Sequence, residues 1–280
     1  MAAPSISVGT ELATVCDAQS STVYVLSSSG LRWMHNNADG LLIYCARVSS
    51  NDYVAITEQK TGYKASVSVY DSKGTLIFRF DSHDRYLSDA MVTKDGKHLI
   101  VMALGESGGS FASTVIVYDI ATANLIGAYP LPDGLAFDLS VTSDSAILLC
   151  DDRMAIVSVN GDTRLNYEYG EEYLHKYALT GGDFCALLLG RYQSSNLCTL
   201  TTFATDGTQL ASLALSEEIL DISAAGDRLA VLFSDTLILY DRELNEVTRL
   251  EGTQHAGVVR MRTDGTALLI SETSARRFLP

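Results

Sequence analysis

Long apolar runs, clustered basic residues and prolines are all scarce in this chain of 280 residues. The longest apolar runs, such as residues 185–189 and 229–233, fall far short of the roughly 18 residues that a membrane-spanning helix needs. Lys and Arg total 20 against 34 Asp and Glu, giving a net charge of −14. This balance disfavours nucleic acid and anionic membrane surfaces as partners, because both attract clustered positive charge.

Cysteine is also sparse, and its spacing carries no motif. The five cysteines are odd in number, form no C-x-x-C pair, and lie in or beside apolar runs. A disulfide framework is therefore disfavoured, and we interpret them as small buried apolar side chains. They are Cys16, Cys45, Cys150, Cys185 and Cys198.

Motifs for catalysis or metal binding are absent from the sequence. The five histidines form neither H-x-H nor H-E-x-x-H, and Trp33 is the single tryptophan, which disfavours a propeller built on repeated Trp motifs. Residues 105–109 match G-x-S-x-G, but a β-like segment follows them instead of the helix that a nucleophile elbow requires. We therefore expect a hairpin loop there, no cofactor, no metal and no catalytic residue.

Short β-like segments fill the chain instead. Runs of four to seven residues rich in Val, Ile, Leu, Tyr and Thr are separated by turn residues every eight to twelve positions, which predicts an all-β fold. Asp-Gly occurs five times and Asn160-Gly161 adds a further pair of the kind found in tight hairpins.

One of these segments recurs along the whole chain. It consists of alternating apolar residues, often closed by an aromatic, followed by a polar turn, as in TVIVYDIAT from Thr114 and TLILYDREL from Thr236. Successive copies are 37 to 48 residues apart, a period typical of the four-stranded blades of a β-propeller. Their last apolar residues are Leu26, Tyr70, Tyr118, Val159, Phe203, Tyr240 and Phe278.

The repeat predicts seven blades of four antiparallel strands, with six blades as the alternative; a β-sandwich or two small β domains would not impose this common spacing. The expected blades span residues 5–40, 41–86, 87–134, 135–173, 174–218, 219–256 and 257–280, the last without its fourth strand. No polar linker interrupts them, so we expect one domain over residues 1–280, with 1–4 as a tail.

A stretch in the second and third units resembles a known family. The segment from Gly62 to Leu99, GYKASVSVYDSKGTLIFRFDSHDRYLSDAMVTKDGKHL, is similar to a signature of an uncharacterised bacterial β-propeller family, and the closing MRTDGTALLISETSARRFLP fits the same pattern. The resemblance covers most of the chain and implies a quinoprotein-like or WD40-like propeller. Family members typically carry an N-terminal membrane helix before an extracytoplasmic propeller, which implies a tethered location with the anchor outside these residues. No activity is carried over from the family.

One repeat position is charged in strands that are otherwise apolar. When the first strands of the second to seventh repeats are aligned, one position is occupied by Tyr44, Asp89, Asp138, Lys176, Asp221 and Arg260. Charges in such strands must be paired or hydrated. We expect a ring of ion pairs lining a central channel, with Asp138 and Lys176 as a couple; the alternative is a channel site for a small ligand or a divalent cation.

A second cluster is aromatic and acidic, YEYGEEYLHKY over residues 167–177. Tyrosine is favoured at recognition surfaces because it joins apolar area to a polar tip. The alternatives are packing between blades and a rim contact with protein or glycan through Tyr167, Tyr169, Tyr173 and Tyr177.

Together these features favour a non-catalytic binding or scaffold propeller of the bacterial cell surface, monomeric, whose partner is a protein, peptide or glycan. The membrane is expected to be reached only through an anchor. Two alternatives stay open: a lactonase-like or lyase-like enzyme using the acidic residues of the channel, and a cytoplasmic WD40-like interaction hub.

Overall fold

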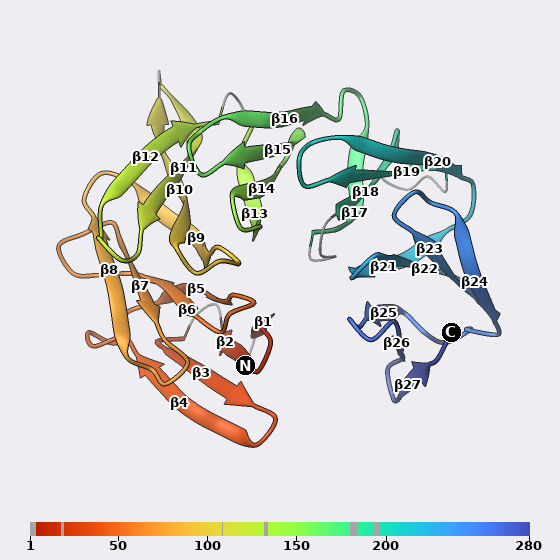
Figure 1. Ribbon diagram of the computed structural model, residues 1–280, viewed down its shortest axis with the longest axis horizontal. Helices are drawn as coiled ribbons and strands as arrows, with labels where there is room; N and C mark the ends of the chain where they lie inside the picture. Colours follow the sequence, from red (N-terminus) through yellow and green to blue (C-terminus); the bar gives the residue numbers. More distant parts are fainter. Residues whose placement is uncertain (1–3, 18–19, 108, 132–133, 180–183, 193–196) are drawn as a thin grey trace. The chain divides into compact units, whose positions relative to one another are not determined.

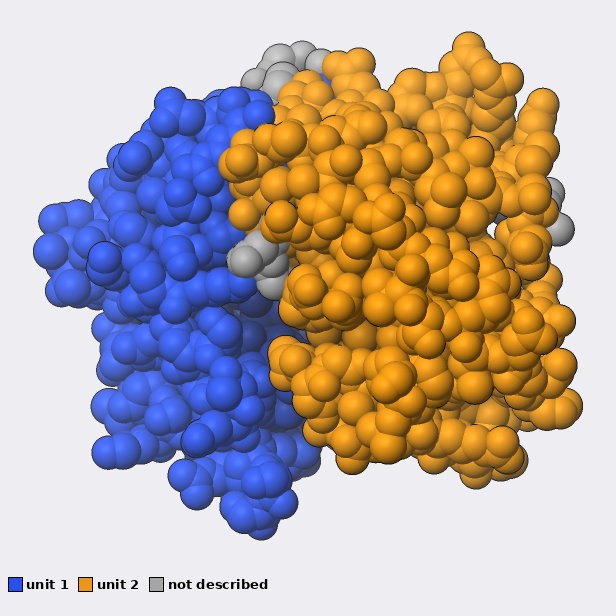
Figure 2. Space-filling model, turned by 45° about the vertical axis from the view of Figure 1, so that its right-hand side comes forward, with its two compact units in different colours: residues 1–164 blue, residues 165–280 orange. Residues whose placement is uncertain are grey.

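The computed structural model describes residues 4–17, 20–107, 109–131, 134–179, 184–192 and 197–280 (Figure 1). Within them the chain forms 27 β-strands and no helix. It divides into two compact units, residues 1–164 and 165–280, which Figure 2 shows in different colours and which we describe separately. The boundary falls within strand β16 (Thr163–Glu168).

Four antiparallel sheets, each formed by consecutive strands, fill the first unit as far as β16. The first contains β1 (Pro4–Val8), β2 (Leu12–Asp17), β3 (Thr22–Ser27) and β4 (Gly30–Asn36). The second contains β5 (Ile43–Val48), β6 (Val54–Glu58), β7 (Ala65–Tyr70) and β8 (Leu76–Ser82). The third contains β9 (Tyr86–Val92), β10 (His98–Ser107), β11 (Ser110–Asp119) and β12 (Leu125–Pro130). The fourth contains β13 (Ala136–Val141), β14 (Ser145–Cys150), β15 (Arg153–Ser158) and β16 (Thr163–Glu168).

Three further sheets follow in the second unit. The fifth contains β17 (Tyr173–Ala178), β18 (Phe184–Gly190), β19 (Cys198–Ala204) and β20 (Gln209–Leu215). The sixth contains β21 (Ile219–Ala225), β22 (Arg228–Phe233), β23 (Thr236–Asp241) and β24 (Glu246–Glu251). The seventh contains only β25 (Val258–Met261), β26 (Ala267–Ile270) and β27 (Ala275–Phe278).

The apolar content of each strand follows its place in the sheet. Every residue of the middle strands β14 and β15 is buried, whereas the fourth strand β24 alternates between exposed and half-buried residues. A strand covered on both faces requires a continuous apolar run, and an edge strand requires alternation. The burial of Leu148, Leu187, Leu229, Val231 and Phe233 follows this rule.

Apolar clusters join neighbouring sheets within each unit. Val23 and Val25 of the first sheet share a cluster with Val54 and Ile56 of the second. Corresponding clusters join the second sheet to the third and the third to the fourth. In the second unit, clusters join the fifth sheet to the sixth and the sixth to the seventh. The core is therefore a series of layers between sheet faces, as in a propeller.

Seven sheets of four strands, the last of three, confirm the predicted seven-bladed all-β propeller. Two predicted limits were wrong by one residue, because Tyr86 opens the third sheet and Tyr173 opens the fifth. The expectation of one domain over residues 1–280 stays a prediction. Of the predicted tail, residues 1–3 lie outside the described residues and Pro4 begins β1.

Candidate functional site

The charged repeat position follows a β-bulge in five successive sheets. In β5, β9, β13, β17 and β21 one residue is skipped in the pairing with the neighbouring strand, namely Tyr44, Ser88, Phe137, His175 and Leu220. The residue after each bulge is paired again, and these residues are Cys45, Asp89, Asp138, Lys176 and Asp221. Bulges redirect side chains at functional or structural positions. By this register Cys45, and not Tyr44, corresponds to Asp89.

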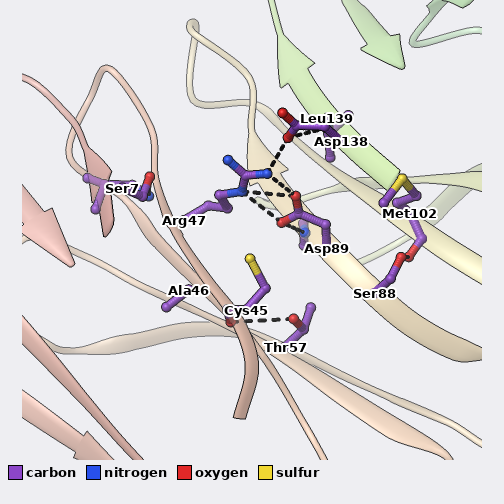
Figure 3. Close-up of polar contacts among 12 residues, drawn as sticks. Ser7, Cys45, Ala46, Arg47, Thr57, Ser88, Asp89, Met102, Asp138 and Leu139 are labelled. Carbon is purple, nitrogen blue, oxygen red and sulfur yellow. Dashed lines mark hydrogen bonds and ion pairs between the residues drawn. The ribbon is translucent and has the colours of Figure 1, made fainter. Parts of the chain in front are cut away.

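Arg47 joins two of these positions in the first unit (Figure 3). Its guanidinium donates two hydrogen bonds from Nε to Asp89, at 3.1 and 2.9 Å, and one from Nη2 at 2.6 Å. The same Nη2 lies 2.5 Å from Oδ1 of Asp138. One arginine on β5 thus links the innermost strands of the third and fourth sheets.

Burial makes this cluster electrostatically strong. The Asp89 side chain is 5% exposed and that of Asp138 is 20% exposed, so water screens the ion pairs weakly. Burial opposes the charge on Arg47, but the Asp89 carboxylate and its hydrogen bonds raise the pKa of Arg47 above its ordinary value. The backbone amides of Ala90 and Leu139 donate further hydrogen bonds to the two carboxylates.

Cys45 lies against the same cluster but does not have the properties of a nucleophile. Burial, followed by the neighbouring Asp89 carboxylate, raises the pKa of the Cys45 thiol well above its ordinary value. Nucleophilic cysteines need the opposite shift, because the thiolate is the reactive form. The thiol is a partly buried group that lies beside Asp89 (Figure 3).

The second unit repeats the pairing with fewer members. Arg260 on β25 donates from Nη1 to Oδ2 of Asp221 at 2.6 Å, and the backbone amide of Val259 donates to the same oxygen. The Arg260 side chain is 57% exposed, so this ion pair is more hydrated than the Arg47 cluster. Lys176 is half-buried on β17. Asp138 and Lys176 belong to different units, so their expected contact stays a prediction.

These contacts determine what the charged positions can bind. Within the described ranges, no group of three or more His, Cys, Asp and Glu is placed to hold a metal ion. The guanidinium of Arg47 lies between Asp89 and Asp138, two of the three acids, with Asp221, that a cation in the expected ring would use (Figure 3). A positive group at that point repels a second cation, so the cluster favours ion pairing over metal binding.

Aromatic side chains are exposed where the innermost strands of the first unit begin. Tyr44 is 37% exposed, Tyr86 is 52% exposed and Phe137 is 50% exposed. Burial and the Tyr86 hydroxyl raise the pKa of Tyr44. Phe111, 71% exposed, lies on the β10–β11 hairpin. We call Tyr44, Tyr86, Phe111 and Phe137 the aromatic rim.

The hairpin that carries Phe111 projects beyond its sheet. Tyr86 at the start of β9 pairs with Leu104, which in turn pairs with Ser113. Residues 105–107 of β10 pair only with β11, and Phe111 lies two residues beyond Ser113, about 7 Å along the strand. The extension therefore carries Phe111 beyond the pairing of β9 and out into solvent.

The predicted tyrosine cluster separates into buried and exposed members. The Tyr167 ring packs edge-on against Phe203 at 4.7 Å between centroids, and Tyr169 is 4% exposed. Tyr173 is 51% exposed and Tyr177 is 37% exposed. The rim contact stays a prediction, and Tyr173 and Tyr177 are the members that offer surface to a partner.

A buried polar network lies in the first unit that the sequence analysis did not find. Nε2 of His35 lies 2.8 Å from a Glu58 carboxylate oxygen, and Nδ1 lies 3.1 Å from the Tyr70 hydroxyl. Arg79 lies 3.9 Å from Glu58. The two His35 contacts join β4 to the second sheet, and the Arg79–Glu58 contact lies within the second sheet, so we interpret the network as a tie between two sheets. No sequence motif indicates this network, because the partners of His35, Glu58 and Tyr70, lie 23 and 35 residues away in the sequence.

The described geometry defines a β-propeller with paired charges after its bulges and an exposed aromatic rim. The chain belongs to a family of unknown function (DUF5711), whose model matches residues 1–277. No curated protein matches the chain significantly. Among the described residues no helix has the length and apolar character needed to span a membrane.

Solved structures similar to this chain are propellers. The WD40 domain of Neurospora crassa Pan2 is 12% identical, with a TM-score of 0.62, over 98% of this chain and 87% of that chain. BamB from Moraxella catarrhalis is 11% identical, with a TM-score of 0.54, over 98% and 83%. The β-propeller domain of Cps50 (Swd1) from Myceliophteria thermophila is 13% identical, with a TM-score of 0.54, over 81% and 78%. At these identities the likeness supports the fold alone.

Proposed function

We propose that this protein is a non-catalytic scaffold that binds a protein partner through the aromatic rim. The exposure of Tyr44, Tyr86, Phe111 and Phe137 carries the proposal. Large aromatic side chains are enriched in the centres of protein interfaces and supply much of their binding energy. A projecting hairpin that exposes Phe111 to solvent costs hydrophobic free energy that a partner recovers by covering it.

The Arg47 cluster supports this function by rigidity. It fixes the innermost strands β5, β9 and β13, whose first residues carry the rim. A preorganised surface loses less conformational entropy on binding. The resemblance to a family with N-terminal membrane anchors favours a location at the bacterial cell surface, with the propeller outside the cytoplasm.

Site-specific photo-crosslinking in the cells that naturally produce the protein tests the proposal. A benzophenone amino acid is placed at Phe111 or Tyr86, and at Ile77, which is 37% exposed on the outer strand β8, as a matched control. We expect one discrete adduct from the two rim positions and none from Ile77. Equal adducts from all three positions, or none from the rim, contradict the proposal.

A further inference from the structure

The outer edge of the seventh sheet has no strand beside it in the described part of the chain. The other six sheets have four strands, whereas this sheet ends at β27 (Figure 1). The edge of a sheet presents unpaired amide and carbonyl groups that accept a further strand. β27 is therefore a candidate for strand addition.

The hairpin register shows which groups of β27 face outward. The amide of Ser271 donates to the carbonyl of Ser274 at 2.8 Å, which makes this a hydrogen-bonded pair. Such pairs alternate along an antiparallel ladder, so Arg276 and Phe278 are bonded to β26. Ala275 and Arg277 then direct their backbone amide and carbonyl groups away from the sheet.

A pocket of about 350 Å³ lies beside this edge, entirely within the second unit. Leu250 of β24, Leu269 of β26 and Phe278 of β27 supply its apolar lining, and Arg276 lies in its wall. The volume suits one or two side chains of a peptide or a small ligand.

Polar groups around the pocket are left without partners. The Thr253 hydroxyl is buried in the lining and makes no hydrogen bond with any described residue. Arg276 is exposed and forms no ion pair with the described part of the chain. Unsatisfied buried groups in native proteins require an explanation, and a bound ligand is one. His255, also in the lining, has a φ of 89°, a strained conformation of the kind that gathers at binding sites.

The existing fourth strands show what kind of segment fits next to a third strand. β4, β12, β16 and β24 place half-buried side chains at alternate positions, as with Trp33 and His35 in β4 or Thr248 and Leu250 in β24. Their other face is exposed. A segment beside β27 would likewise direct every second side chain toward the pocket.

We propose that the β27 edge and its pocket bind an extended acidic peptide segment of a partner protein as a fourth strand. Two arginines lie on this strand: Arg277 is 3.9 Å from Asp264, and Arg276 forms no ion pair with the described residues and is the cation left for a ligand, although Glu251 also lines the pocket. Two copies of β27 paired across a two-fold axis would place these arginines against their own counterparts, which is unfavourable. The charge therefore selects an acidic partner over a second copy. The site shares no residue with the aromatic rim, and the proposal does not depend on it.

The register predicts the order of residues in the ligand. Phe278 and Arg276 lie on the pocket face, and a strand added antiparallel meets Phe278 first and Arg276 two residues later. An apolar residue opposite Phe278 fills the pocket, and an acidic residue opposite Arg276 pairs with it. The recognised pattern is apolar-x-acidic, with main-chain hydrogen bonds to Ala275 and Arg277.

Fluorescence anisotropy with the whole chain and a labelled synthetic peptide, TVTLTET, tests the proposal. We expect saturable binding that falls at least tenfold for Arg276→Glu and is unchanged for Arg242→Glu, an exposed arginine outside the pocket. The charge-swapped peptide TVTLTKT should bind wild type at least tenfold more weakly and bind Arg276→Glu better than wild type. N-methylation of alternate peptide amides should abolish binding.

Amide hydrogen exchange locates the contact. Bound TVTLTET should slow exchange at the amides of Ala275 and Arg277 at least tenfold. The proposal is overturned if TVTLTET does not bind saturably, or if TVTLTKT does not bind Arg276→Glu better than wild type. It is also overturned if the peptide slows amide exchange in strands other than β27. Protection of β27 in the free protein that disappears on dilution would instead assign the edge to a second copy and also overturn it.

Discussion

Arg47 on β5 donates to Asp89 on β9 at 2.6 Å and, through the same nitrogen, to Asp138 on β13. Asp89 and Asp138 lie 42 and 91 positions after Arg47 in the sequence, yet the three side chains form one largely buried cluster. Removing one member of a buried ion pair leaves the others charged and unpaired, which costs far more than losing a surface contact.

Arg47→Met should therefore destabilise the protein by about 3–5 kcal/mol, because Asp89 loses its counter-ion while remaining buried. Arg260→Met is the matched control, since Arg260 is 57% exposed and its ion pair is hydrated; its loss should stay below about 1 kcal/mol. Urea denaturation measures both. Similar losses for the two variants would show that the Arg47 cluster has no special place in the fold.

Asp81 should make stability depend on acid pH. Burial works against its charge, but hydrogen bonds from Lys60 and Ser66 lower the pKa of the Asp81 carboxyl below its ordinary value. The stabilisation is complete above the unfolded pKa, near 3.9, and is lost as the pH falls through the folded value.

Asp81→Asn should consequently lower the free energy of unfolding at pH 7 by about 1 kcal/mol. The difference from wild type should shrink as the pH is lowered to about 3, close to the unfolded pKa. Paired urea titrations at the two pH values measure it. A difference that does not change with pH would refute the role of this ion pair.

Phe233 should be a major contributor to the core between the fifth and sixth sheets. It is 3% exposed and packs in a cluster with Phe184 and Leu229. Phe233→Ala should cost about 3–5 kcal/mol, whereas Phe111→Ala, at a residue 71% exposed, should cost less than about 0.5 kcal/mol. A loss below about 1 kcal/mol at Phe233 would argue against this packing.

Gly161 should tolerate alanine less well than Gly170. Both have positive φ, 92° and 63°, so both replacements carry the backbone strain of the left-handed region, about 1 kcal/mol. A Cβ at Gly161 would also lie 2.1 Å from Cε1 of Tyr129, while one at Gly170 meets nothing within 4 Å. Gly161→Ala should therefore cost a further 1–3 kcal/mol or so in thermal or urea unfolding. Equal costs would mean that Tyr129 moves aside freely.

The fold was largely predictable because its signals are local. Continuous apolar runs such as residues 229–233 indicate middle strands, and Asn160-Gly161 indicates a hairpin, without knowledge of distant contacts.

The paired charges were predictable as positions but not as partners. The bulge at Tyr44 breaks the two-residue alternation, so simple alignment matched Tyr44 to Asp89 where the register gives Cys45. Arg47 lies two residues after Cys45. As a single basic residue in an otherwise apolar strand, it was the one feature of the sequence that indicated a buried ion pair there. The half-buried Tyr167 packs against Phe203, 36 residues away, and no local sequence pattern indicates this contact.

Affinity for the partner identified by crosslinking tests the proposed function most directly. Tyr86→Ala and Phe111→Ala should each weaken binding at least tenfold, because exposed aromatic anchors carry much of an interface's free energy. Ile77→Ala, on the outer strand β8, should leave the dissociation constant unchanged. Unchanged affinity in both rim variants, or an equal loss in Ile77→Ala, would contradict recognition through the aromatic rim.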